Sequence, residues 1–228
     1  MSQGVSMFCT NCGEETDLKL RHCQHCQFDL IHVQLLLDED GLDDDLEDEF
    51  RDASECAKRC IILYALKSVA LGAETKPVVA WLQYEDLWPA VSNEEKSFFL
   101  STNPTETQVI NASWRVEALS LLLWALGKNV DVSDLSTMCD TDKVDSVCNF
   151  YLKSTLSFIE SSKLISESKI YDINEKIYDA HWKIRDAKIN NKPVDENYDS
   201  GVIMERHHAI NWLMGYCGQD WDDVTTDT

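Results

Sequence analysis

Four cysteines near the N-terminus have a spacing that is typical of a metal site. The segment FCTNCGEETDLKLRHCQHCQ contains two Cys-x-x-Cys pairs separated by ten residues. Two such pairs supply four thiolates to a tetrahedral Zn²⁺ and leave no coordination position open for a substrate. The pattern therefore predicts one structural zinc ion, bound by Cys9, Cys12, Cys23 and Cys26.

Two alternatives stay open for this segment. A Cys-x-x-Cys pair can be redox-active instead of metal-binding, and His22 or His25 could replace one cysteine as a ligand, although four thiolates suffice. A segment this short has almost no hydrophobic core, so a bound metal would supply most of its folding free energy. The segment resembles the short zinc ribbons at the N-termini of many bacterial proteins, which accompany many different functions.

A second set of chemically capable residues lies on otherwise apolar segments in the C-terminal half. Histidines and carboxylates that share a partly buried place can act as acid and base near neutral pH. No phosphate-binding loop, nucleophile elbow, His-Glu-x-x-His motif or di-metal spacing accompanies them. We therefore predict a structural polar network between helices, with a binding cleft or a catalytic site as alternatives. Its members are Arg115, Glu117, His181, Trp182, Arg185, Glu205, Arg206, His207, His208 and Asn211.

Arg206 and Glu117 are the two members for which the sequence predicts a specific partner. Arg206 falls inside the apolar stripe of its own helix, and Glu117 stands at the start of the apolar run ALSLLLWAL. An arginine keeps its charge when it is buried, so it must find a carboxylate or reach water. We expect Arg206 to pair with Glu117, directly or through His207.

Helices have to position these residues. The run ALSLLLWAL, residues 118–126, is apolar on every side except at Ser120, so a helix here must be covered all round. Capping boxes at Thr105 and Ser92 and a closing Gly127 bound this central helix and a shorter one before it. Further helices are predicted over 46–72, 77–87, 144–161, 168–190 and 201–216, with an exposed connection over 131–139 and an acidic tail anchored by Trp221.

The predicted helix over 144–161 has its inner face formed by Val147, Tyr151, Leu152, Leu156 and Ile159. In the predicted helix over 168–190 the apolar residues recur every three or four positions, at Ile170, Ile173, Ile177, Ala180, Ile184 and Ala187. No segment alternates as a β-strand does. The fold class is mainly α, a compact multi-helix domain around a central hydrophobic helix, preceded by a small zinc ribbon. An acidic run over 38–52 separates the two parts. The predicted organisation is a ribbon at 1–37, an acidic linker at 38–45 and an all-helical domain at 46–228.

The helical part resembles an uncharacterised bacterial helical family, domain of unknown function 4272. The resemblance rests on INASWRVEALSLLLWALG at 110–127, DAHWKIRDA at 179–187, and GVIMERHHAINWLMGY followed by WDDV within 201–224. It runs from about residue 53 to the end and does not include the zinc ribbon. It implies an all-helical architecture and no particular activity.

Charge and cysteine usage limit the classes of function. Twenty Lys and Arg against 41 Asp and Glu give a net charge of −21, which disfavours nucleic acid or an anionic membrane as a partner. The chain has no secretory signal and no apolar run long enough to span a bilayer. Nine cysteines, four of them in the two pairs, suit a reducing compartment, so we expect a cytoplasmic protein.

The preferred function is a non-enzymatic interaction or adaptor protein that binds another, basic protein, for example by neutralising a toxin. An enzyme that uses the Arg-His-Glu cluster is the first alternative. Nucleic-acid binding through the ribbon, whose loop carries Lys19, Arg21, His22 and His25, is the second.

Overall fold

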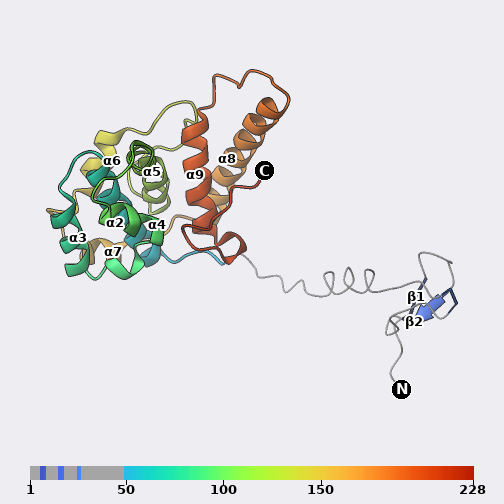
Figure 1. Cartoon of the computed structure of the whole chain (residues 1–228), viewed down its shortest axis with the longest axis horizontal. Helices are drawn as coiled ribbons and strands as arrows, with labels where there is room; N and C mark the ends of the chain where they lie inside the picture. Colours follow the sequence, from blue (N-terminus) through green and yellow to red (C-terminus); the bar gives the residue numbers. More distant parts are fainter. Residues whose placement is uncertain (1–5, 9–14, 18–24, 27–48) are drawn as a thin grey trace. The chain divides into compact units, whose positions relative to one another are not determined.

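The computed structural model describes residues 6–8, 15–17, 25–26 and 49–228. The chain divides into two compact units, Met1–Glu47 and Asp48–Thr228. The prediction of a mainly helical fold is confirmed (Figure 1). The predicted linker at 38–45 lies outside the described residues. Within the described ranges, no helix combines the length and the apolar character that crossing a bilayer requires.

The first unit contains a short antiparallel hairpin that the sequence does not predict. Strand β1 (Ser6–Phe8) pairs with β2 (Glu15–Asp17). Each strand has three residues, which is too short for an alternating pattern to be recognised. Of the four predicted zinc ligands, Cys9, Cys12 and Cys23 lie outside the described residues, and Cys26 lies in a turn.

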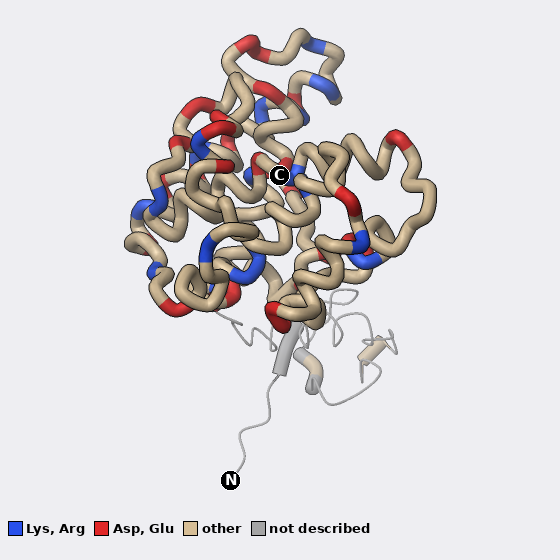
Figure 2. The backbone as a smooth tube through the Cα atoms, turned by 90° about the vertical axis from the view of Figure 1, so that its left-hand side faces the viewer, with Lys and Arg blue, Asp and Glu red and all other residues tan. Residues whose placement is uncertain are grey.

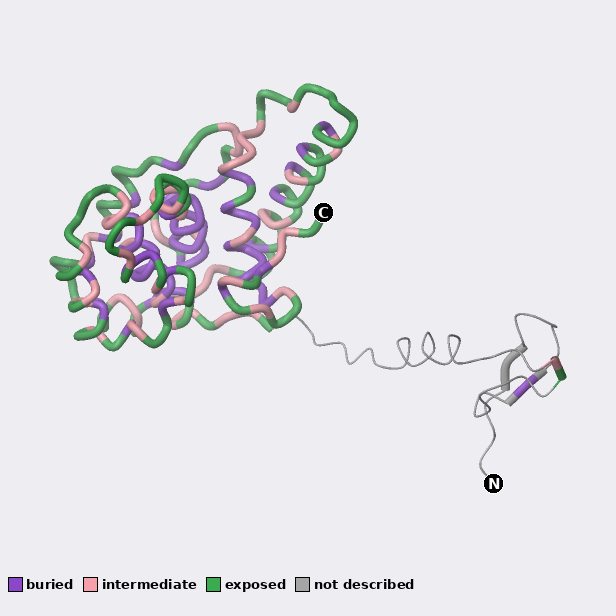
Figure 3. The backbone as a smooth tube through the Cα atoms, viewed as in Figure 1, coloured by how far each residue is buried: buried purple, intermediate pink, exposed green. Residues whose placement is uncertain are grey.

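The second unit consists of helices around one hydrophobic core. Helix α5 packs against α2 on one side and α9 on the other, and α8 packs on α9. In Figure 3 the buried positions concentrate on these central helices. The elements are α2 (Ala53–Ala70), α3 (Thr75–Tyr84), the 3₁₀ helix η1 (Trp88–Ala90), α4 (Asn93–Leu100), α5 (Glu106–Ala125), α6 (Thr141–Cys148), α7 (Thr155–Ser161), α8 (Glu167–Ile189), α9 (Ser200–Met214) and η2 (Tyr216–Gly218).

Helix α5 is the covered helix that the sequence predicts. Thr105 and Gln108 form the expected capping box, and Ser92 and Glu95 form the one before α4. The run from Ala118 to Leu123 is completely buried. Burial on all sides explains why this helix has no polar stripe.

Helix α2 begins later than the predicted start at Leu46. Its N-cap is Asp52, whose carboxylate accepts a hydrogen bond from the amide of Glu55. A side chain that caps in this way fixes the first turn after it, and the acidic residues before it repel one another. Helix α3 differs in the opposite direction. It begins at Thr75, two residues before the predicted first residue Pro77, and it ends at Tyr84.

The single helix predicted over 144–161 is wrong. Helix α6 ends at Cys148, Asn149 leaves the helical conformation, and α7 starts only at Thr155. The break inserts Phe150 into the core, where its ring lies 4.8 Å from that of Phe158 and 5.5 Å from that of Tyr64. The predicted inner residues Tyr151, Leu152 and Leu156 are exposed instead.

The chain enters the second unit beside the end of α9. The amide of Arg51 donates to the carbonyl of Leu213 over 2.8 Å, and the guanidinium donates to the carbonyl of Gln219 over 2.8 Å. Gly215 has a φ of +76°, and a Cβ there would lie 2.2 Å from the Glu49 carbonyl oxygen. Only glycine fits at this crossing.

Candidate functional site

The Glu117 carboxylate and the Arg206 guanidinium form a sealed ion pair between α5 and α9. Arg206 Nε and Nη2 donate to Glu117 Oε2 over 3.1 and 2.8 Å. Both side chains are at most 1% exposed. The predicted pairing is confirmed, and it is direct.

The 131–139 segment completes this pair through its backbone, although most of its residues are exposed, as the sequence predicts. Arg206 Nη1 donates to the carbonyls of Val132 and Asp134, and the amide of Cys139 donates to Glu117 Oε1 over 2.7 Å. Val132 and Cys139 are therefore buried. Both oxygens of Glu117 are occupied, so this carboxylate holds the segment in place and is closed to a substrate.

A second polar group joins Arg115, Glu205 and His208. Arg115 Nη1 donates to Glu205 Oε2 over 3.1 Å and lies 3.5 Å from His208 Nδ1. Burial raises the pKa of Glu205 against the lowering effect of Arg115. His208 Nε2 lies 2.9 Å from the Trp221 carbonyl, which can only accept, so Nε2 carries the proton and Nδ1 accepts from Arg115. Burial, with Arg115 adding to it, lowers the pKa of His208 to about 3.

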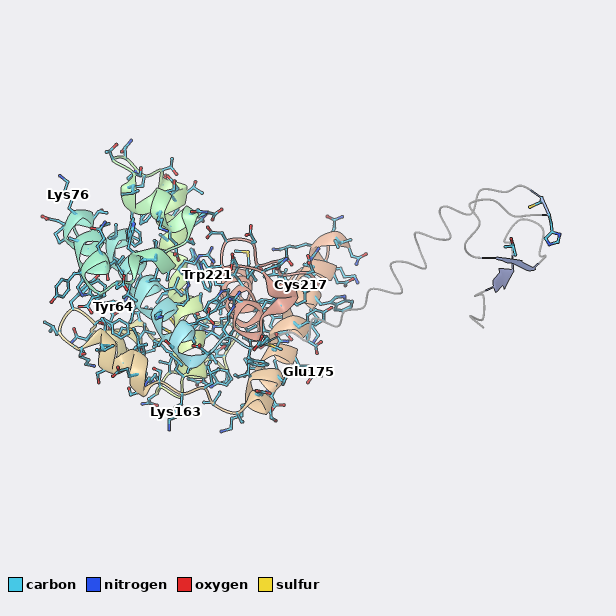
Figure 4. All side chains as sticks on the ribbon, turned by 90° about the horizontal axis from the view of Figure 1, so that it is seen from below. Tyr64, Lys76, Lys163, Glu175, Cys217 and Trp221 are labelled. Carbon is cyan, nitrogen blue, oxygen red and sulfur yellow. The ribbon has the colours of Figure 1, made fainter. Side chains whose placement is uncertain are left out.

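The acidic C-terminal tail is anchored by Trp221, as the sequence predicts, but its surroundings were not predicted. The Trp221 ring, 4% exposed, packs edge-on against His208 at 4.6 Å and Trp212 at 5.3 Å. The guanidinium of Arg59 lies 4.7 Å from its centroid, and that of Arg115 lies 5.7 Å from it. Cations over an indole face attract its negative charge distribution. We call these side chains the Trp221 cage; Figure 4 labels Trp221.

Arg59 and Glu95 support the cage and were missed from the sequence. Arg59 Nη1 donates to both Glu95 oxygens, over 3.0 and 2.8 Å, and Nη2 donates to the Ala90 carbonyl over 2.9 Å. Glu95 also accepts from the Ser92 amide, as the capping box requires. The available signal was an arginine inside the apolar run of α2 together with a capping glutamate.

His181 and His207 form a third group, between α8 and α9. Their Nδ1 atoms lie 2.8 Å apart. Burial, with the charge of His181 as a second cause, lowers the pKa of His207 to about 4, and burial lowers that of His181. Asn211 lies on the same helix and donates to the Thr225 carbonyl over 2.9 Å, which ties the tail to α9.

Seven of the ten predicted polar residues thus form three separate groups. Asn211 contacts the tail instead, and Trp182 and Arg185 belong to none of the groups. Trp182 is 51% exposed and Arg185 is also exposed, both on the outward side of α8. The structure does not bring them to Glu117, Glu205 or His207. Both side chains therefore belong to the exposed side of α8.

Metal and thiol chemistry find little support in the helical unit. Among the residues that the structure describes, no group of three or more His, Cys, Asp or Glu side chains could hold a metal ion. Burial raises the pKa of Cys139 and Cys148 to about 12, and burial also raises that of Cys60. These thiols stay protonated at neutral pH and pack as small apolar groups.

A cavity of about 340 Å³ adjoins the Trp221 cage. Leu66, Phe98 and Ala112 form its apolar part, and Trp221 forms part of the wall. Its acidic lining includes Glu94, whose amide donates to Asp222 Oδ2 over 3.0 Å. The charged lining residues are Glu94, Glu95, Asp222 and Arg115. Glu95 is paired with Arg59 and Arg115 with Glu205, which leaves Glu94 and Asp222 for a ligand with an apolar stem and a cationic end.

The helical unit is acidic even without the preceding linker. Residues 49–228 hold 18 Lys and Arg and 29 Asp and Glu, a net charge of −11. Figure 2 shows acidic positions distributed over the unit. Three basic residues, Arg59, Lys67 and Arg206, and three acidic ones, Glu95, Glu117 and Glu205, are buried. The excess of acidic residues therefore lies outside the core.

A family model described as a domain of unknown function, DUF4272, matches residues 41–224. The chain belongs to this family. The match covers most of the helical unit and leaves out the predicted zinc ribbon. No curated protein and no solved structure matches the chain.

Proposed function

We propose that this protein is a non-catalytic interaction protein that binds a basic protein through its acidic helical domain. The saturated pair of Glu117 and Arg206 carries the proposal. The most deeply buried carboxylate and guanidinium of the predicted cluster are used to hold α5, α9 and the 131–139 segment together. A group whose hydrogen-bonding atoms are all occupied inside the core has no capacity left for a reacting substrate.

The remaining polar groups also favour binding over catalysis. His207 and His208 have pKa values far below neutrality, and a general base is most effective when its pKa lies near the operating pH. No nucleophile accompanies Arg115 and Glu205 in the contacts of the described chain. We therefore prefer the interaction protein to the enzyme.

The cavity beside the Trp221 cage is the proposed contact site. A lysine or arginine of the partner would place its aliphatic stem on Leu66 and Phe98 and its charge near Glu94 and Asp222. A negative surface also accelerates the encounter with a basic partner. The same surface disfavours nucleic acid, because phosphates would meet carboxylates.

The N-terminal unit is proposed to be a structural zinc ribbon with Cys9, Cys12, Cys23 and Cys26 as ligands. The support is the sequence spacing and the hairpin of β1 and β2, which flanks the first cysteine pair in the chain. A site with four thiolates stabilises a small fold and does not activate water. The ribbon would act as a second binding module.

Affinity capture with the full chain as bait tests the proposed contact site. A Glu94→Gln/Asp222→Asn bait removes two charges at the cavity and keeps the side-chain shapes. A Glu74→Gln/Glu160→Gln bait removes two exposed charges elsewhere. We expect basic host proteins to be retained at low salt by the wild type and the control, and about tenfold less by the cavity variant, since tenfold corresponds to about 1.4 kcal/mol.

Two results would contradict the proposal. Equal retention by all three baits would place the contact away from the cavity. The absence of any protein whose retention decreases at high salt would contradict the basic partner itself, because screening weakens attraction between exposed charges.

A further inference from the structure

Helix α8 exposes a row of large apolar side chains away from its buried side. Two of them also contact rings of the same unit at their edges: Tyr171 lies 5.5 Å from Phe50, and Tyr178 lies 6.0 Å from His207 of α9. Tyr171 is 50% exposed, Tyr178 44%, Trp182 51% and Ile189 76%. The opposite side is buried against the core by Ile170, Ile177, Ala180, Ile184 and Ala187. In Figure 1, α8 lies at the edge of the helical unit, with α3 at the other end. The exposed row is therefore a second apolar face on a helix that already has a buried one.

The exposed row has the spacing of a coiled-coil seam. Trp182 follows Tyr178 by four residues, and Ile189 follows Trp182 by seven. Glu175 and Arg185 are exposed on the same side of the helix. With them, the seam consists of positions 171, 175, 178, 182, 185 and 189, whose spacings alternate between four and three residues. Such a seam is the surface by which one α-helix packs along another. Over 18 residues it extends about 27 Å, since each residue adds about 1.5 Å.

The order of residues in the seam is symmetric about position 180. Tyr178 and Trp182 lie two positions from it, Glu175 and Arg185 lie five, and Tyr171 and Ile189 lie nine. A twofold axis beside position 180 of an antiparallel helix pair would place each residue opposite its counterpart. Tyr178 then faces Trp182 of the partner subunit, and Glu175 faces Arg185 of the partner subunit.

We propose that the exposed seam of α8 binds the same seam of a second copy in an antiparallel, twofold-symmetric pair. This inference goes beyond the proposed function and is independent of it. The antiparallel register brings opposite charges together twice, because each Glu175 meets an Arg185 of the partner subunit. A parallel pair in register would instead place Glu175 against Glu175 and Arg185 against Arg185. Charge complementarity therefore selects a second copy in this orientation.

The affinity of this pair is moderate. One helix from each copy buries less than a standard interface of about 1,600 Å². We expect a dissociation constant in the range of roughly 1 to 100 µM, equivalent to about 5 to 8 kcal/mol. The aromatic residues next to the axis contribute most, as large buried aromatic residues do in other interfaces.

Sedimentation velocity of the full chain tests the pair through its charges. Between about 1 and 300 µM, which spans the expected dissociation constant, the wild type should shift from monomer to dimer. Glu175→Arg and Arg185→Glu alone should each weaken dimerisation at least tenfold, because like charges then face each other. The double variant Glu175→Arg/Arg185→Glu should restore it. Lys76→Glu on α3 changes the charge as Arg185→Glu does and should leave dimerisation unchanged (Figure 4 labels Lys76 and Glu175).

Trp182→Glu provides an independent readout, since it places a charge beside the axis. We expect a monomer at all concentrations with an unchanged helical circular dichroism spectrum, because Trp182 is half exposed and outside the core. A wild-type chain that stays monomeric throughout would overturn the proposal. A dimer that survives Trp182→Glu, or single charge reversals that the double variant does not rescue, would overturn the seam or its register.

Discussion

The Nδ1 atoms of His181 and His207 lie 2.8 Å apart across the contact between α8 and α9. Such a contact needs one ring to donate and the other to accept, so the pair is stable only when at least one imidazole is neutral. His207 has its pKa lowered to about 4 by burial and by His181. The pair therefore makes the α8–α9 contact sensitive to acid.

Lowering the pH should destabilise the helical unit before its carboxylates are protonated. An unfolded histidine has a pKa of about 6.5. Below that pH the unfolded chain takes up the proton that native His207 resists, so stability is complete above about pH 6.5 and is lost as the pH falls toward 4. Urea unfolding at pH 7 and pH 5 should show that His207→Gln loses roughly 2 kcal/mol less than the wild type, at 1.36 kcal/mol per pH unit. Equal losses would contradict this role of His207.

Removing the Glu117 carboxylate should be far more costly than removing the whole ion pair. Glu117→Ala strands the charge of Arg206 inside the core, which should cost about 3 to 5 kcal/mol of unfolding free energy. Glu117→Leu/Arg206→Leu removes both charges and should cost much less. Denaturant unfolding of the two variants makes the comparison. A double variant at least as unstable as the single one would show that the ion pair itself contributes most of the stability.

Trp221→Ala should release the tail and destabilise the helical unit. The ring is nearly completely buried and contacts His208, Trp212 and Arg59. Deleting a buried tryptophan typically costs about 3 to 5 kcal/mol. Tyr84→Ala is the control, because its side chain is 86% exposed and its loss should change stability by less than about 0.5 kcal/mol. Thermal unfolding followed by circular dichroism measures both, and similar effects would mean that the tail is not anchored by Trp221.

Purified full-length protein should contain about one zinc ion per chain, since four thiolates bind one tetrahedral ion. Cys12→Ser should lose the metal in elemental analysis. Its helical melting should hardly change, because the cysteines and the helices belong to different compact units. A metal-free wild type would contradict the zinc site, and a large loss of helical stability would show that the two units stabilise each other.

The elements predicted correctly have local causes. The capping boxes at Ser92 and Thr105 and the repeating stripe of α8 are each defined within a few residues. The Arg206–Glu117 pair was predictable because a permanent charge in an apolar stripe can be satisfied in few ways. For the helices and for this ion pair alike, nearby residues or a single permanent charge exclude most other structures.

The elements predicted wrongly depend on distant contacts. At the break after Cys148, Phe150 packs between Tyr64 and Phe158. Asn149 at the end of α6 and the N-cap Ser154 of α7 are only weak local signs of it. In the mostly exposed 131–139 segment, the contacts of the Val132 and Asp134 carbonyls with Arg206 likewise depend on a residue far away in the sequence. The grouping of Arg59 and Glu95 around Trp221 joins α2, α4 and the tail, which only tertiary packing brings together.

The place where the chain enters the helical unit has a consequence for partners of the N-terminal unit. Arg51 is bonded to the carbonyls of Leu213 and Gln219, next to the tail that carries Trp221. The point at which residues 1–47 are joined to the helical unit therefore lies next to this tail. Tethering replaces the concentration of a partner in solution by a high local concentration. A single partner with two weak binding segments would then be held by both units much more tightly than by either one alone.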